Sequence, residues 1–370
     1  GWDGEAWERL AFQPAPGPEW TPSGLPDGAW EVFVRVRDGA GNESLPASLR
    51  VQIDTSPPAV SLDPPPERAR AGELEIRWKA SDERSGVGVV RVQQRREAGK
   101  HRSDWETVYE GMGSSVAVKG LDGWRMRYRV VAEDLAGSSA AAEAPHAVLY
   151  DGSPPAPVTV IEVRSLAGGD LLAKWAPVED ALGEVARYHV FRKTGGAGPE
   201  ARIATVPANV LEHLDEGLGL AHGETYSYRV SAEDSVGNVQ EEGTSASGVC
   251  DKEASQPVLG SPTHPAEGWT DRTEAMLEWD PPKDHTGITE YLWRVDRDPA
   301  GSLVRGADES VPGPTLRIRG LADGLSYAHV ASVDGAGNVS PAAHYPLRVF
   351  TRPPRARLKP CPSFIGSRSV

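Results

Sequence analysis

One short turn sequence recurs four times in this chain, and it constrains the fold more than any other feature. The copies lie roughly 100 residues apart, about the length of one two-sheet β-domain. An Asp side chain accepts hydrogen bonds from amides further along a turn, Gly adopts positive φ without steric cost, and Asn tolerates the same left-handed region. The sequence therefore predicts a tight reversal between paired strands in each copy. The four copies are Asp38-Gly-Ala-Gly-Asn42, Asp134-Leu-Ala-Gly-Ser138, Asp234-Ser-Val-Gly-Asn238 and Asp334-Gly-Ala-Gly-Asn338.

A segment of alternating apolar and polar residues precedes each turn. Alternation with a period of two, rich in β-branched and aromatic residues, is the signature of a half-buried strand. The segment before the fourth turn alternates less regularly, and its inward face is not assigned. The three regular segments carry Val32/Val34/Val36, Met126/Tyr128/Val130/Ala132 and Tyr226/Tyr228/Val230/Ala232 on one face.

A tryptophan lies on an early predicted strand of each complete repeat, at Trp78, Trp175 and Trp279. A large aromatic side chain between two sheets is the usual centre of a small sandwich core. We therefore expect these three residues to be packing residues.

Residues 154 to 251 resemble a fibronectin type III domain, through the opening prolines at Pro154, Trp175, the strand from Tyr188 to Arg192, and Tyr226 with Tyr228. Two other regions resemble bacterial cell-surface immunoglobulin-like repeats. Residues 263 to 349 do so through Thr263-His-Pro265, Trp279-Asp-Pro-Pro282, Thr286-Gly-Ile288 and Leu321-Ala-Asp-Gly324, and residues 57 to 150 through Ala80-Ser-Asp82, Ser85-Gly-Val87 and Trp105.

The resemblance implies an all-β fold of tandem antiparallel β-sandwiches and an extracellular or cell-surface setting. Short joints that contain proline suggest that neighbouring modules form a semi-rigid rod. The predicted divisions are an incomplete module at 1–54, complete modules at 55–153, 154–254 and 255–351, and a basic, proline-rich tail at 352–370.

The first module has only the C-terminal half of the repeat, because its early strands and their tryptophan are missing. Half a sandwich leaves an apolar inner face and unpaired strand edges. Two hypotheses remain open: the chain is excised from a longer protein, or a strand from another subunit completes the module. The candidate face for a partner comprises Trp30, Val32 and Val34.

Three aspartates, Asp54, Asp151 and Asp251, stand at matching positions beside the predicted joints. They raise the question of calcium between modules, but calcium takes six to eight oxygen ligands and no Asp-rich motif lies beside them. Capping of strand ends is therefore the favoured interpretation. The sequence predicts no metal site and no cofactor, and calcium at the joints is left open.

The formal net charge of −14 disfavours nucleic acid and anionic lipid as partners. No segment has the roughly 20 apolar residues that a membrane helix needs, so we expect no membrane insertion. Cys250 and Cys361 are too few for a disulfide framework, and whether they are bonded is open. The basic tail carries a further hypothesis, namely docking onto an acidic module.

The nine histidines are scattered singly, and no catalytic or zinc-binding spacing is present. We therefore predict no catalytic residues and no enzyme activity. The favoured function is a structural or adhesive spacer of a bacterial surface protein, whose partners are other protein chains. The alternatives are a subunit of a filament or assembly completed by a neighbouring chain, and an accessory region of a secreted polysaccharide-degrading enzyme, in which case glycan would be a partner.

Overall fold

The computed structural model describes residues 24–196, 198–352 and 355–357. The chain divides between Ser153 and Pro154 into two compact units. Almost all regular structure is β-strand, as predicted, and the single helical turn among the described residues is the 3-10 turn Gly217–Gly219. Cys361 and most of the basic tail lie outside the described residues.

The first unit begins with a two-stranded antiparallel sheet of β1 (Gly28–Val34) and β2 (Ala47–Ile53). Beyond β1 the chain continues to the turn at Asp38, where Arg37 and Glu43 form an isolated bridge. Several large apolar side chains of this region are exposed. They are Phe33, Val34, Val36, Leu45, Leu49 and Val51.

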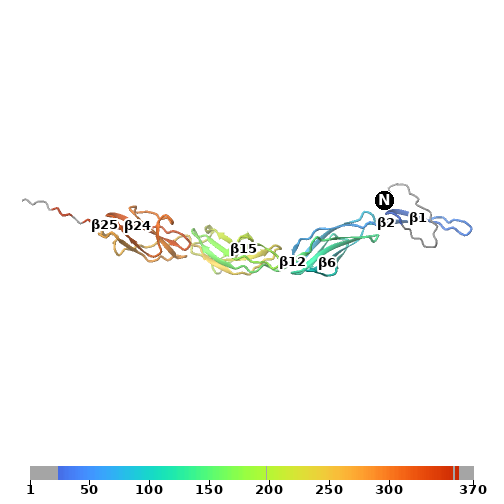
Figure 1. Ribbon diagram of the computed structural model, residues 1–370, viewed down its shortest axis with the longest axis horizontal. Coiled ribbons are helices and arrows are strands. Elements are labelled where there is room, and N and C mark those ends of the chain that lie inside the picture. Colours follow the sequence, from blue (N-terminus) through green and yellow to red (C-terminus); the bar gives the residue numbers. More distant parts are fainter. Residues whose placement is uncertain (1–23, 197, 353–354, 358–370) are drawn as a thin grey trace, which may run out of the picture. The chain divides into compact units, whose positions relative to one another are not determined.

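The first sandwich follows in the same unit (Figure 1). One sheet has the order β3-β5-β9, and the other has the order β4-β12-β10-β6-β7, with β11 beside β10 and β8 beside β6. The strands are β3 (Ala59–Leu62), β4 (Arg68–Arg70), β5 (Gly72–Ser81), β6 (Val87–Ala98), β7 (His101–Arg102), β8 (Glu106–Gly111), β9 (Ser115–Gly120), β10 (Arg125–Asp134), β11 (Ser139–Glu143) and β12 (Val148–Asp151).

The second unit contains the second and third sandwiches. The second packs sheet β13-β14-β17 against sheet β16-β15-β18-β19, and the third packs β20-β23 against β22-β21-β24-β25. Their strands are β13 (Val160–Ser165), β14 (Leu171–Trp175), β15 (Val185–Thr194), β16 (Glu200–Pro207), β17 (Glu212–Asp215), β18 (Thr225–Asp234), β19 (Ser245–Val249), β20 (Ala275–Glu278), β21 (Ile288–Asp296), β22 (Glu309–Val311), β23 (Thr315–Ile318), β24 (Gly324–Asp334) and β25 (Ala343–Val349).

Each sandwich encloses its own hydrophobic core. Trp78, Trp175 and Trp279 lie in these cores, which confirms their predicted role, and each contacts the ring of a tyrosine. The predicted inward faces of β10 and β18 are also buried. On the irregular strand β24 the core-facing residues are Ala328 and Val330.

The four turns form as predicted, with one correction. In each, the first Asp accepts backbone hydrogen bonds within the turn, and the Gly has φ between 89° and 96°. No described residue other than glycine has positive φ, so the Asn does not adopt the left-handed conformation. Its side-chain amide instead donates to the second oxygen of the Asp, at 2.9 Å, 2.8 Å and 2.7 Å in the turns that end at Asn42, Asn238 and Asn338.

Candidate functional site at the joints

The first joint connects β2 to β3. Asp54, directly after β2, accepts hydrogen bonds from the amide of Ser56 at 3.0 Å and from the amide of Ser85 at 2.9 Å. The first bond is the predicted strand-end cap. The second reaches the loop between β5 and β6, and the side chain of Gln52 donates to the carbonyl of Arg84 in the same loop, at 3.2 Å. The end of β2 is therefore fixed to the first sandwich by hydrogen bonds.

Asp27 strengthens this joint from the segment before β1. It accepts hydrogen bonds from the hydroxyl and the amide of Thr55 and from the hydroxyl of Ser56, and it lies 3.7 Å from Arg84. These bonds hold the pKa of Asp27 below its ordinary value, and the Thr55 hydroxyl has the largest effect. The charged form is thus the one that the joint favours.

The joint within the second unit lies between β19 and β20, and it is called joint two, while the joint after β2 is called joint one. Asp251 is fully buried, and its Oδ2 accepts hydrogen bonds from the hydroxyl of Thr286 at 2.7 Å and from its amide at 3.1 Å. The side chain of Asn338 donates to the carbonyl of Asp251 at 3.0 Å and accepts from the amide of Gly168 at 2.8 Å. The turn 334–338 of the third sandwich therefore contacts the end of the second.

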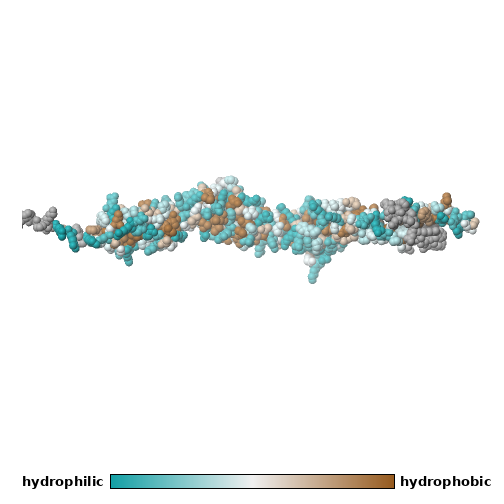
Figure 2. All heavy atoms as spheres, turned by 90° about the horizontal axis from the view of Figure 1, so that it is seen from above, coloured by the Kyte–Doolittle hydropathy of each residue, from teal (hydrophilic) through white to brown (hydrophobic). Residues whose placement is uncertain are grey.

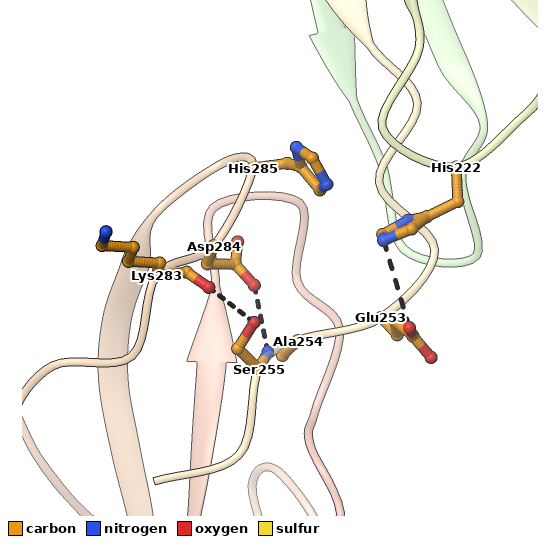
Figure 3. Close-up of a pocket in the computed structure, with 7 residues that line it drawn as sticks. All are labelled: His222, Glu253, Ala254, Ser255, Lys283, Asp284 and His285. Atoms are coloured by element: carbon orange, nitrogen blue, oxygen red, sulfur yellow. Dashed lines mark hydrogen bonds and ion pairs between the residues drawn. The ribbon is translucent and has the colours of Figure 1, made fainter.

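A polar pocket of about 250 Å³ opens beside this joint (Figure 3). The rings of His222 and His285, which both line it, meet edge to face, with centroids 4.9 Å apart. Ser255 donates to the carboxylate of Asp284 and to the carbonyl of Lys283. Since residues of both sandwiches line the pocket, it belongs to the joint.

Each joint also brings together three carboxylates that are far apart in the sequence. In each set, one oxygen from every aspartate lies within 4.8 Å of the others. The first comes from the end of the preceding sheet and the third from the recurrent turn. The second comes from a loop of the following sandwich, between β5 and β6 at joint one and between β20 and β21 at joint two. The joint-one cluster is Asp54, Asp82 and Asp134, and the joint-two cluster is Asp251, Asp284 and Asp334.

The carboxylates have different environments in the two clusters. Hydrogen bonding from Ser85 lowers the pKa of Asp54. At joint two, burial raises the pKa of Asp251, and the neighbouring charges of Asp284 and Asp334 add to this effect, whereas the bond from Thr286 opposes it. The charged form of Asp251 at joint two is therefore less favoured than the charged form of Asp54 at joint one.

The candidate face predicted from the sequence lies apart from the joints. Trp30, Val32 and Val34 all belong to β1, where the first two are half-buried and Val34 is exposed. The indole of Trp30 donates to the carbonyl of Pro26. A partner for this face stays a prediction.

Sequence reasoning found the strand-end aspartates but missed the residues that join them. Asp82 precedes Ser85-Gly86 by three positions and Asp284 precedes Thr286-Gly287 by two, and this shared pattern is the signal that could have identified them. The turn aspartates were explained as local turn formers, so their position at a joint went unrecognised.

No protein-family model matches the chain. Human usherin is 26% identical over 175 residues, a match that covers 46% of this chain and 3% of usherin. Among solved structures, the FN1-FN3 domains of chicken CNTN1 cover 79% of this chain and 98% of theirs, at 16% identity and a TM-score of 0.33. Domains A168-A170 of titin cover 61% of this chain and 75% of theirs, at 14% identity and a TM-score of 0.40.

The paired sheets, the buried tryptophans and the recurrent turns define a class. The chain is a tandem array of antiparallel β-sandwiches, the fold that the resemblance to fibronectin type III and immunoglobulin-like repeats implied. Within the described residues, no helix is both long and apolar enough to pass through a bilayer.

Proposed function

We propose that this chain is a non-catalytic extracellular spacer that holds protein-binding surfaces at set separations and mediates contacts with other proteins. Polar and apolar residues are interspersed on the visible faces of the second and third sandwiches (Figure 2).

The observation that carries the proposal is the bridging role of Asn338. Its side chain bonds to Asp251 and to Gly168, both from the second sandwich, while it is anchored by Asp334 in its own turn. A flexible linker would not need directional bonds of this kind. A spacer does, because the bonds fix one sandwich against the next.

Spin-label distance measurements on the full chain test this proposal. Labels at Glu162→Cys and Glu309→Cys, both exposed, report on the second and third sandwiches. We expect one narrow distance distribution, and a broader one when Asn338→Ala is added. A chain without the introduced cysteines controls for labelling of Cys250. A distribution as broad as that of a flexible linker would contradict the spacer role.

A second candidate function is a subunit of a larger assembly, and the β1–β2 sheet favours it. Phe33, Val34 and Leu49 are 62%, 56% and 67% exposed on this sheet. Two strands alone form a marginal structure in water, and exposed apolar strands are suited to pairing with a further chain. A strand from a second copy would extend this sheet.

Light scattering of the full chain over a range of concentrations tests the assembly candidate. We expect a rise in mass with concentration, and we expect Phe33→Lys with Leu49→Lys to abolish it. Substitution of Leu218, which is 96% exposed on the second sandwich, by Lys is the matched control. A monomer at every concentration would overturn this candidate and leave the spacer role intact.

A further inference from the structure

We propose that the two carboxylate clusters at the joints, Asp54/Asp82/Asp134 and Asp251/Asp284/Asp334, are binding sites for a divalent cation, and that the ion is Ca²⁺. The proposal goes beyond the spacer role, which does not require an ion. It also replaces the prediction from the sequence that the chain has no metal site.

The first support is an unpartnered buried oxygen at joint one. Asp134 is 3% exposed, and its Oδ1 accepts hydrogen bonds from the amides of Ala136 and Ser138. Its Oδ2 is buried and has no hydrogen-bond donor. In the other three turns this oxygen accepts a bond from the Asn amide, but Ser138 replaces that Asn here. A buried charged oxygen without a partner calls for a cation.

Joint two shows the same feature on a different residue. Asp251 is 0% exposed, and its Oδ2 is bonded to Thr286, whereas its buried Oδ1 accepts no hydrogen bond. The nearest basic group to this oxygen is Nδ1 of His222, at 3.7 Å, but that nitrogen already accepts a bond from the amide of Lys252. His222 therefore presents a lone pair, not a proton, on this side of its ring.

Among the residues that the structure describes, neither cluster is neutralised by a Lys or Arg side chain. Within the described part of the chain, no Lys or Arg forms an ion pair with any of the six aspartates, and Arg84 at joint one pairs with Asp27 instead. Three carboxylates that present oxygens within 4.8 Å of one another repel strongly when buried. A divalent ion among those oxygens removes that repulsion.

The ligand set selects the class of ion. All six side chains offer carboxylate oxygens, which suit hard cations rather than zinc or copper. Each oxygen has two lone pairs, so one that accepts a backbone hydrogen bond can still coordinate. Ca²⁺ accepts six to eight oxygens in irregular geometry, and water or backbone carbonyls can supply the rest, whereas Mg²⁺ demands a near-ideal octahedron.

Such an ion would connect neighbouring parts of each unit. Asp54 follows β2, while Asp82 and Asp134 belong to the first sandwich; Asp251 follows β19, while Asp284 and Asp334 belong to the third. Because ligands come from both sides, bound Ca²⁺ would stabilise the joint as well as the cluster.

Calorimetric titration of the full chain with CaCl₂, after dialysis against EDTA, tests the proposal. The two variants are Asp134→Asn and Asp334→Asn, and Asp38→Asn is the matched control, because residues 38–42 and 334–338 have the same sequence but Asp38 belongs to neither cluster. We expect each variant to lose one bound ion, the double variant to lose two, and the control to bind as many ions as the unmodified chain. Asp82→Asn and Asp284→Asn, which leave the turns intact, should repeat the two single losses.

Circular dichroism of each variant ensures that a loss of binding is not a loss of folding. The proposal is overturned if the unmodified chain gives no binding heat up to about 10 mM Ca²⁺, roughly tenfold above the weakest dissociation constants of extracellular calcium modules. It is also overturned if the folded variants bind as many ions as the control. Equal affinity for Mg²⁺ would overturn the assignment of calcium.

Discussion

The turns 38–42 and 334–338 have the same five residues, yet they lie in opposite environments. In both, the Asn donates its backbone amide to one oxygen of the Asp and its side-chain amide to the other. Asp334 and Asn338 are 2% and 8% exposed at joint two, whereas Asp38 and Asn42 are exposed. The five residues therefore determine the conformation of the turn, and what packs against it determines whether it becomes part of a site.

The largest difference between the two turns is expected for removal of the Asn side chain. Asn338→Ala removes the bonds to Asp251, Asp334 and Gly168 and leaves buried groups without partners, which should cost about 3 kcal/mol. Asn42→Ala removes a bond between exposed groups, which water replaces, so its effect should be much smaller. Hydrogen exchange of the β24 and β1 amides measures both. Equal losses at the two sites would show that the joint contributes nothing.

Substitution of the turn glycine should destabilise both turns by the same amount. Gly41 and Gly337 have φ of 93° and 96°, a conformation that disfavours side chains. Gly41→Ala and Gly337→Ala should each destabilise the adjoining strands by about 1 to 2 kcal/mol, because the strain is local. The same exchange experiment compares them. A loss confined to Gly337→Ala would mean that contacts at the joint, not backbone strain, dominate.

The turn 134–138 is the one copy with Ser in place of the final Asn, so that Asn can be restored there. Ser138→Asn would supply the amide that the other turns have and give the buried Oδ2 of Asp134 a donor. In EDTA we expect this variant to gain about 1 kcal/mol in the free energy of unfolding, measured by urea denaturation. Ser138→Ala is the control and should give no gain. A destabilised Asn variant would argue against an unsatisfied oxygen at this position.

The smallest expected effect is a change in the pKa of Asp38. Hydrogen bonds, first from the Asn42 side chain, hold the pKa of Asp38 below its ordinary value of 3.8. Because the folded pKa is depressed, the stabilisation is present above the unfolded pKa and is lost as the pH falls through the folded one. NMR titration of the Asp38 carboxyl carbon should therefore give a pKa below 3.8, which Asn42→Ala raises. An unchanged pKa in that variant would refute the role of the Asn amide.

Much of the fold could be predicted because its signals are local. The alternation on β10 and β18, the tryptophans and the turn residues are each readable within a few positions. The role of the Asn in the turn was predicted wrongly, because its backbone does not adopt positive φ and its side chain donates to the Asp instead. Both are properties of Asn, and only the conformation separates them. The rod arrangement and the four-module division stay predictions.

The carboxylate clusters could not be predicted in the same way, because their members are distant in sequence. Asp54 and Asp134 are separated by most of a sandwich, and only the pairing of β10 with β6 brings the turn to the loop that carries Asp82. Repetition was the available clue. Asp82 and Asp284 occupy equivalent loops, and a comparison of the repeats position by position would have shown them.

The position of the recurrent turn has a consequence for how such a chain grows. At both joints a sandwich supplies two of the three aspartates itself and takes the third from the strand end that precedes it. Each receiving sandwich therefore carries most of the surface of its joint in its own sequence, and only the aspartate at the preceding strand end comes from outside it. A copy of such a sandwich would take both of its receiving loops with it, so that only one residue of a new joint would have to be supplied by its neighbour.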